Sequence, residues 1–208
     1  MGLADLVIGQ VDRALRTLSG QHHSRRPNPA EHLADPPLEA DAGRHAAGLM
    51  RVNHSGEICA QALYQGQALT ARDANVRRVL LQAAEEEADH LAWCEARLQE
   101  LHSHPSVLNP AFYAMSYAMG AVTGMLGDKI SLGFVEATED QVCRHLEAHL
   151  DSLPDEDARS REIVACMRED EARHGSEALS RGGAEFPAPL KRAMTLLSRI
   201  MTESTYRV

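Results

Sequence analysis

Glu87-Ala88-Asp89-His90 and Glu171-Ala172-Arg173-His174 are two copies of one short pattern, a glutamate followed three positions later by a histidine. Residues three apart lie on the same face of an α-helix, about one turn from each other. If both stretches are helical, each presents a carboxylate and an imidazole that can bind the same metal ion. A single copy is weak evidence, because glutamate and histidine are common in helices.

Both motifs interrupt apolar seams of helical spacing. The first seam consists of Val76, Leu80, Ala83, Glu87, His90, Cys94, Leu98 and Leu101. The second consists of Val164, Met167, Glu171, His174 and Ala178. Steps of three and four residues are typical of the buried face of a helix. We therefore expect helices over about 74–102 and 156–181, with the motif side chains facing the core.

Two other segments have a similar seam with one glutamate in it. In a predicted helix over about 42–71 the seam is Met50, His54, Glu57, Gln61, Tyr64 and Ala68. In another, over about 128–152, it is Leu132, Val135, Glu139, Val142, Leu146 and Leu150 or Leu153.

The spacing of these glutamates forms an internal repeat. Glu57 precedes Glu87 by 30 residues, and Glu139 precedes Glu171 by 32. The midpoints lie at positions 72 and 155, where turn-forming residues stand. If each pair closes as an antiparallel hairpin, its two members face each other, and packing of the hairpins brings two half-sites together.

These segments predict an all-α protein with a ferritin-like four-helix bundle. The stretch between the second and third helices is long enough to cross the bundle from end to end. We expect an accessory N-terminal helix in residues 1–20, a proline-rich and mobile linker in 21–40, and a ferritin-like domain with the motif residues in 41–208. A further amphipathic helix follows Pro189, with Leu190, Met194, Leu197 and Met201 in its stripe.

Charge balance favours metal ions over buried ion pairs. None of the four seams contains a lysine or an arginine, and four buried glutamates without a cation would repel one another. Two divalent ions would neutralise the four carboxylates. Carboxylate and imidazole ligands without a thiolate suit iron or manganese rather than structural zinc, and we expect ferrous iron with positions open to dioxygen.

Composition excludes other classes of protein. The formal net charge is −9, and an acidic chain without a basic patch is repelled by the phosphates of nucleic acid. We therefore exclude a nucleic-acid-binding protein. Cys59, Cys94, Cys143 and Cys166 form no C-x-x-C pair, and no secretory signal precedes them, so we expect reduced thiols in a cytoplasmic compartment.

Four stretches resemble the motifs of the demethoxyubiquinone hydroxylase family. They are Asn53-His54-Ser55-Gly56-Glu57, Glu86-Glu87-x-x-His90, Ala137-Thr138-Glu139-Asp140 and Asp170-Glu171-x-x-His174. The similarity covers roughly 42–208, in family order and spacing. Members are ferritin-like di-iron monooxygenases of ubiquinone biosynthesis. The resemblance therefore implies an enzyme that hydroxylates the ring of a polyprenyl demethoxyubiquinol with dioxygen.

The resemblance also implies residue roles. Glu57 and His90 would cap one iron, Glu139 and His174 the other, and Glu87 and Glu171 would bridge both. These six are the expected catalytic and metal-binding residues. Asp170 resembles an aspartate that stands behind a ligand histidine, here His90. Glu136, one turn before Glu139, is the competing ligand, although the family register favours Glu139.

The implied cofactors are two Fe²⁺ ions per chain, with dioxygen as co-substrate. The implied partners are a polyprenyl quinol, a membrane surface and other proteins of ubiquinone biosynthesis. The implied location is peripheral, at the cytoplasmic face of the cell membrane.

The electron balance of the implied reaction is incomplete. Dioxygen takes up four electrons and the substrate supplies two. The donor of the other two stays open between NADH, a partner protein and the quinone itself.

The crossover, residues 105–127, carries no charged side chain. Its aromatic residues and methionines are Phe112, Tyr113, Met115, Tyr117, Met119 and Met125. Consecutive helical residues diverge by ~100°, so these cannot all face one core. We expect an amphipathic segment that docks on lipid, with a purely core segment as the alternative. The C-terminal stripe either extends this face or covers the end of the bundle.

Other interpretations stay open. A ferritin-like ferroxidase or iron-storage module would use the same ligands, and a scaffold with a vestigial metal site is a third option. Tyr64 either lies over the metals or is an ordinary core tyrosine. His54 either hydrogen-bonds within the site or stands at the start of a helix. We expect His145 and His149 to face solvent.

Overall fold

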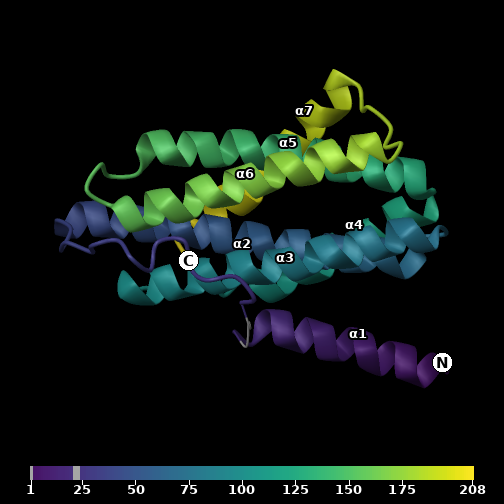
Figure 1. The fold of residues 1–208 in the computed structure, drawn as a ribbon, viewed down its shortest axis with the longest axis horizontal. Coiled ribbons are helices and arrows are strands. Elements are labelled where there is room, and N and C mark those ends of the chain that lie inside the picture. Colours follow the sequence, from purple (N-terminus) through teal and green to yellow (C-terminus); the bar gives the residue numbers. More distant parts are fainter. Residues whose placement is uncertain (1, 21–23) are drawn as a thin grey trace.

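The computed structural model describes residues 2–20 and 24–208, and these contain seven α-helices and no β-strand (Figure 1). The helices are α1 (Leu3–Leu18), α2 (Ala40–Thr70), α3 (Ala74–Glu100), α4 (Asn109–Met125), α5 (Asp128–Ser152), α6 (Ala158–Ser180) and α7 (Ala188–Thr205). The predicted all-α class is confirmed, and the four long helices lie within a few residues of the predicted ranges.

Helices α2, α3, α5 and α6 form the bundle (Figure 1). Each hairpin turn ends in an aspartate that caps the next helix. Asp73 accepts a hydrogen bond from the backbone N–H of Asn75 at 2.6 Å, and Asp157 accepts one from the backbone N–H of Ser160 at 3.0 Å. Side-chain caps of this kind satisfy backbone donors that a helix start leaves free.

The crossover contains α4, which lies along α2 at very short range. A Cβ atom on Gly120 would stand 2.2 Å from the backbone oxygen of Leu63, and one on Gly66 would stand 2.2 Å from the backbone oxygen of Tyr117. Glycine at both positions allows the two backbones to approach. The crossover is therefore part core, and it still exposes Met115, Met119, Val122 and Met125 on its other side.

Two apolar clusters of the core follow one another along the bundle, and a third, with Ile58, Ala62, Leu91 and Tyr113, lies beside them. One contains Met50, Trp93, Cys94, Leu98, Leu146, Val164 and Met167. The other contains Tyr64, Leu80, Ala83, Leu132, Val135 and Ala178. On every bundle helix the seam glutamates and histidines lie between the two clusters. The predicted metal-binding residues thus occupy the middle of the core.

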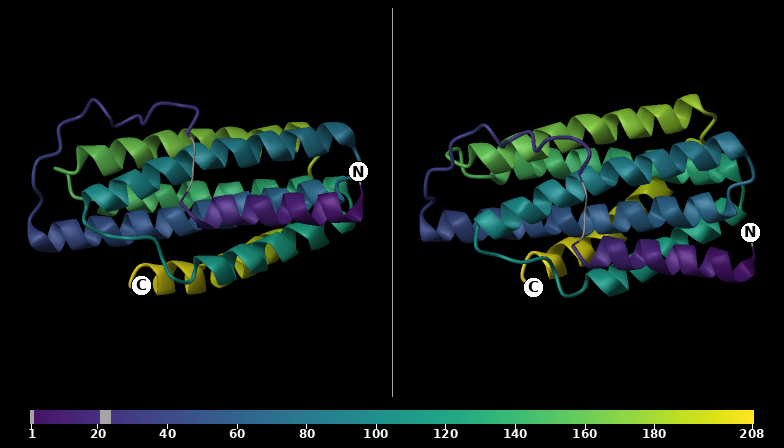
Figure 2. Two further views of the ribbon diagram at one scale, coloured as in Figure 1. Left: turned by 90° about the horizontal axis from the view of Figure 1, so that it is seen from below. Right: turned by 60° about the horizontal axis from the view of Figure 1, so that its bottom comes forward.

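Helices α1, α4 and α7 lie on one side of the bundle (Figure 2). Each exposes apolar side chains: Val7, Ile8, Val11 and Leu15 on α1, the four named above on α4, and Leu196, Leu197 and Ile200 on α7. The residues of the predicted stripe on α7 differ in exposure, since Leu197 is exposed and Met201 is partly buried.

Among the described residues, no helix is both long and apolar enough to span a membrane.

Residues 24–38 of the predicted linker contact the bundle, through Arg26 and through Asp35, which pairs with Arg97. Arg26 pairs with Asp89 of α3 and Asp170 of α6, at 2.9 and 2.7 Å. Its guanidinium also lies 4.8 Å from the ring centre of Trp93. Residues 21–23 lie outside the described part of the chain. The division into three domains stays a prediction.

Candidate metal centre

Each E-x-x-H motif occupies one face of a helix, as the spacing requires. In α3, Nδ1 of His90 lies 3.0 Å from Oε2 of Glu87. In α6, Nδ1 of His174 lies 3.1 Å from Oε2 of Glu171. All four side chains are buried. The two motifs therefore present equivalent half-sites to the centre of the bundle.

Three carboxylates converge on one nitrogen, Nδ1 of His90. Besides Glu87, the Oε1 atom of Glu171 lies 3.1 Å away and the Oε2 atom of Glu57 lies 3.4 Å away. A single N–H donates well to only one of three oxygens. Accordingly Oε2 of Glu57 and Oε1 of Glu171 are buried without a hydrogen bond of good geometry. The same holds for Oε1 of Glu87, which faces His174 instead.

Ligand atoms of Glu57, Glu87, His90 and Glu171 lie within 4.8 Å of one another. Glu87 and Glu171 also reach the second histidine, since Nδ1 of His174 lies 3.3 Å from Oε1 of Glu87. Both glutamates thus face both histidines, as bridging ligands must.

Glu139 approaches from the α5 side of the site. It is buried, and a Cβ atom on Gly175 would touch its own Cβ at 3.3 Å. Its Oε1 accepts a hydrogen bond from the hydroxyl of Tyr64 at 2.5 Å. Neither Glu139 nor the competing candidate Glu136 belongs to the group of four whose ligand atoms lie within 4.8 Å of one another. Glu136 pairs instead with Lys191 at 2.7 Å. The structure therefore brings Glu139 to the site and directs Glu136 away from it.

Burial and neighbouring carboxylates shift the pKa values of the glutamates and histidines of the centre. Burial raises the pKa of Glu57 and Glu139 well above the usual value, and neighbouring glutamates add to this shift. For the two histidines burial alone would lower the pKa, but the surrounding carboxylates outweigh it; they raise the pKa of His174 to about 12 and that of His90 well above its usual range. Without metal, the cluster holds protons where divalent cations would otherwise balance its charge.

The outer nitrogen of each histidine faces a carboxylate from the other hairpin. Nε2 of His90 lies 3.0 Å from Oδ2 of Asp170, and Nε2 of His174 lies 2.9 Å from Oε2 of Glu86. When Nε2 carries the proton and donates to these oxygens, Nδ1 is left free to bind a metal. Asp170 was anticipated, whereas Glu86 was not assigned a role, although each acid directly precedes the motif glutamate.

Two arginines complete this outer network. Arg173 bonds both Glu86 and Asp170 through Nη2, each at 2.8 Å. Arg26 binds the other oxygen of Asp170 from the linker. No periodicity marks Arg26, so sequence reasoning missed it.

Tyr64 and His54 are both buried in the bundle. Tyr64 is buried beside the cluster, and burial together with nearby carboxylates raises the pKa of its hydroxyl well above the usual value. His54 is buried in the middle of α2, far from its start, with Nδ1 3.3 Å from Nδ2 of Asn109. The cysteines are free thiols, and Cys94 is buried.

His149 is buried, and this overturns our expectation that it faces solvent. Its ring lies 4.0 Å from that of His145, centre to centre, on the inner side of α5. His145 is half-buried. The direction of Glu139 alone does not determine exposure on α5, because α2 and α7 also lie beside this part of the helix.

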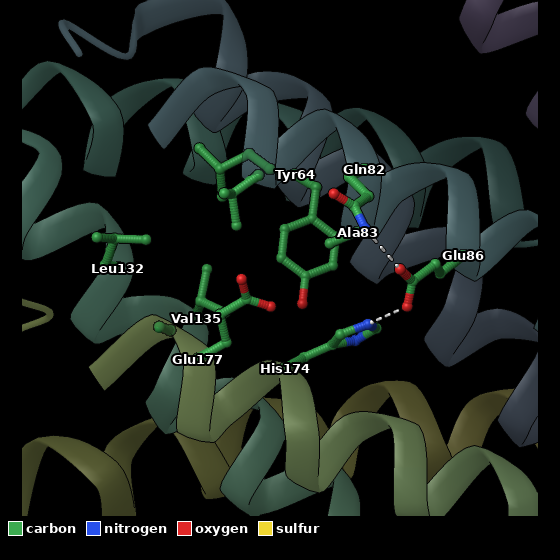
Figure 3. Close-up of a pocket in the computed structure, with 11 residues that line it drawn as sticks. Tyr64, Gln82, Ala83, Glu86, Leu132, Val135, His174 and Glu177 are labelled. Carbon is green, nitrogen blue, oxygen red and sulfur yellow. Dashed lines mark hydrogen bonds and ion pairs between the residues drawn. The ribbon is translucent and has the colours of Figure 1, made fainter. Parts of the chain in front are cut away.

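Two cavities adjoin the centre. One, of about 20 Å³, lies beside Tyr64, Glu86 and His174 (Figure 3). In Figure 3 the Tyr64 hydroxyl and the His174 ring lie at the same side of it. The other, of about 270 Å³, lies between α2, α5 and α7 and reaches Glu57. The centre is thus accessible from two sides by spaces of very different size.

The chain is similar to proteins of known activity over almost its whole length. Residues 44–205 match the family described as ubiquinone biosynthesis protein COQ7. The 3-demethoxyubiquinol 3-hydroxylase of Ectopseudomonas mendocina is 58% identical over 207 residues, which cover 98% of this chain and 95% of that protein. That of Azotobacter vinelandii is 58% identical with the same coverage, and that of Stutzerimonas stutzeri is 57% identical over 208 residues, 99% of this chain and 96% of that protein.

Proposed function

The chain belongs to the ubiquinone biosynthesis protein COQ7 family, and on that premise we propose that two ferrous ions, bound by six buried side chains, serve its reaction. The activity is the 3-hydroxylation of 3-demethoxyubiquinol in ubiquinone biosynthesis. The proposed ligands are Glu57, Glu87, His90, Glu139, Glu171 and His174. The observation that carries this proposal is the convergence of Glu57, Glu87 and Glu171 on Nδ1 of His90.

The donor set fits iron. It consists of carboxylate oxygens and imidazole nitrogens, and several of these oxygens lack a hydrogen bond although they are buried. Buried polar atoms are normally paired, so unpaired oxygens at one point indicate a missing cation. Bound iron would supply the activation of dioxygen that ring hydroxylation needs.

The protein residues have separate tasks in this arrangement. Glu87 and Glu171, which face both histidines, would hold the two ions together. Asp170 and Glu86 would orient His90 and His174 and fix the proton on Nε2. Tyr64 holds Glu139 through its hydroxyl. Burial of the whole cluster excludes bulk water from the reacting atoms.

A lipid-borne substrate explains the exposed apolar side chains of α1, α4 and α7. Figure 2 shows these helices on one side of the bundle, and we infer that their exposed apolar side chains form one apolar face there. We propose that this face docks peripherally on the cytoplasmic side of the cell membrane, where the four free cysteines would stay reduced. Tyr113, one of the predicted docking residues, is buried and binds Gln65 at 2.7 Å, so it does not belong to the face.

Isotope labelling tests the chemistry. Reduced, iron-loaded protein receives dioxygen labelled with the heavy oxygen isotope and a short-tailed demethoxyquinol. We expect the label in the new ring hydroxyl of the product. Oxidation of many irons per chain, with no label in the quinol, would instead support the storage alternative.

A further inference from the structure

The larger cavity is a space between three helices that is partly open to solvent and reaches Glu57 of the metal centre. It has a volume of about 270 Å³ and is lined from α2, α5 and α7. A cavity of about 150 Å³ suffices for benzene. The space beside Glu57 can therefore hold a substituted aromatic ring, whereas the cavity of about 20 Å³ beside Tyr64 holds no more than a water molecule.

Polar atoms without partners line this cavity. They are Oδ1 of Asn53, Oε1 of Gln141 and Nε2 of His145. Asn53 is 3% exposed. Buried polar groups are usually hydrogen-bonded within the protein, and three unpaired atoms at one cavity indicate a polar ligand there.

Helix α7 covers the cavity with its polar face inward. Thr195, Ser198 and Thr202 line the cavity, while Leu196, Leu197 and Ile200 are exposed on the opposite side. A helix that only covered a core would have the reverse orientation. Each hydroxyl donates to a backbone oxygen of α7 itself, at 3.0–3.1 Å, which leaves its lone pairs free as acceptors.

We propose that this cavity binds the ring of the quinol, and that Asn53 and Gln141 bind its oxygen substituents. The inference rests on the proposed function, because it takes the ring to be the group that must reach the metals. A side-chain amide both donates and accepts hydrogen bonds, so it matches a phenolic hydroxyl and an ether oxygen alike. Val142 and Leu146 supply apolar walls for the ring faces.

Equilibrium binding tests the proposal without turnover. Diferrous protein is titrated with a short-tailed demethoxyquinol by calorimetry in the absence of dioxygen. Replacement Gln141→Met keeps the length of the side chain and removes its hydrogen bonds, so the quinol should bind about tenfold more weakly. Iron content should stay at the wild-type level, and with dioxygen restored KM should rise while kcat changes little.

A second variant fills the space itself. Ser198→Phe places a ring in the cavity and should abolish quinol binding, whereas Glu203→Phe, on the exposed side of the same helix, should leave it unchanged. Wild-type affinity in both Gln141→Met and Ser198→Phe would overturn the assignment of the cavity. A wild-type protein that binds the quinol but puts no label into the product would overturn the proposed function and leave this binding site standing.

Discussion

Asp170, which precedes the glutamate of the second E-x-x-H motif, contacts the histidine of the first, with 3.0 Å between its Oδ2 and Nε2 of His90. Glu86 does the same for His174 from the other hairpin. Each histidine is therefore oriented by an acid from the opposite hairpin. Neither half-site is complete until the two hairpins have packed, so metal affinity and bundle assembly should be coupled.

The two glutamates of α5 give the sharpest test of the ligand set. Glu139→Ala should lower iron content below two per chain and abolish hydroxylation, because it removes a buried carboxylate beside Glu171 and His174. Glu136→Ala is the matched control, one turn away on the same helix, and should retain both irons. Metal analysis of the purified proteins measures the iron content of both variants. Loss of iron in Glu136→Ala but not in Glu139→Ala would show that Glu136 is the ligand.

Arg26 should act on the metals through Asp170. Arg26→Ala removes the ion pair that fixes this carboxylate, so we expect ferrous iron to bind about tenfold more weakly. Arg25→Ala is the control, since its partner Glu85 is a surface residue and does not contact the site. Anaerobic titration with ferrous iron measures both. Equal affinity in the two variants would show that the linker contact has no role in metal binding.

The bundle and its centre were predictable because their pattern is periodic. Seams such as Leu80–Ala83–Glu87–His90 repeat every three or four residues, and the structure buries all four of these side chains. Arg26 could not be predicted, because its contacts with Asp89 and Asp170 join residues more than 60 positions apart without any repeat. The inward polar face of α7 was missed for a related reason: amphipathic spacing shows that a helix has two faces, but not which one is covered.

Arg97 shows that a buried cation can also lie outside the seams. Its side chain is 1% exposed and pairs with the fully buried Asp157 at 2.9 Å. Arg97→Met should lower the free energy of unfolding by about 3–5 kcal/mol, because it leaves that carboxylate buried without its partner. Urea unfolding measures the change. Arg144→Met, at an exposed pair with Asp140, should cost less than about 1 kcal/mol.

Acid should destabilise the fold partly through His149. Burial, with help from His145 and His45, lowers the pKa of His149 to about 3. Between that value and the pKa of the unfolded chain, near 6.5, the unfolded state binds more protons, so stability falls as the pH falls. From pH 6.5 to pH 5 the loss from this residue is roughly 1.6 kcal/mol. In His149→Leu the free energy of unfolding, measured with urea, should fall by that much less between pH 6.5 and pH 5. An unchanged pH dependence would contradict the lowered pKa of His149.

Membrane docking should depend on exposed methionines of α4 rather than on its aromatic residues. Met115 is 67% exposed and Met119 is 44% exposed, whereas Tyr113 is buried against α2. Transfer of two such side chains into lipid is worth roughly 3 kcal/mol, enough for reversible binding together with α1 and α7.

The double variant Met115→Asp with Met119→Asp should therefore co-sediment less than the wild-type protein with anionic and neutral vesicles alike. Gln99→Asp with Ser180→Asp adds the same charge on α3 and α6, away from the apolar face, and should sediment as wild type does with neutral vesicles. Equal binding of both double variants to neutral vesicles would mean that α4 does not touch lipid, and that the quinol enters from another side of the bundle.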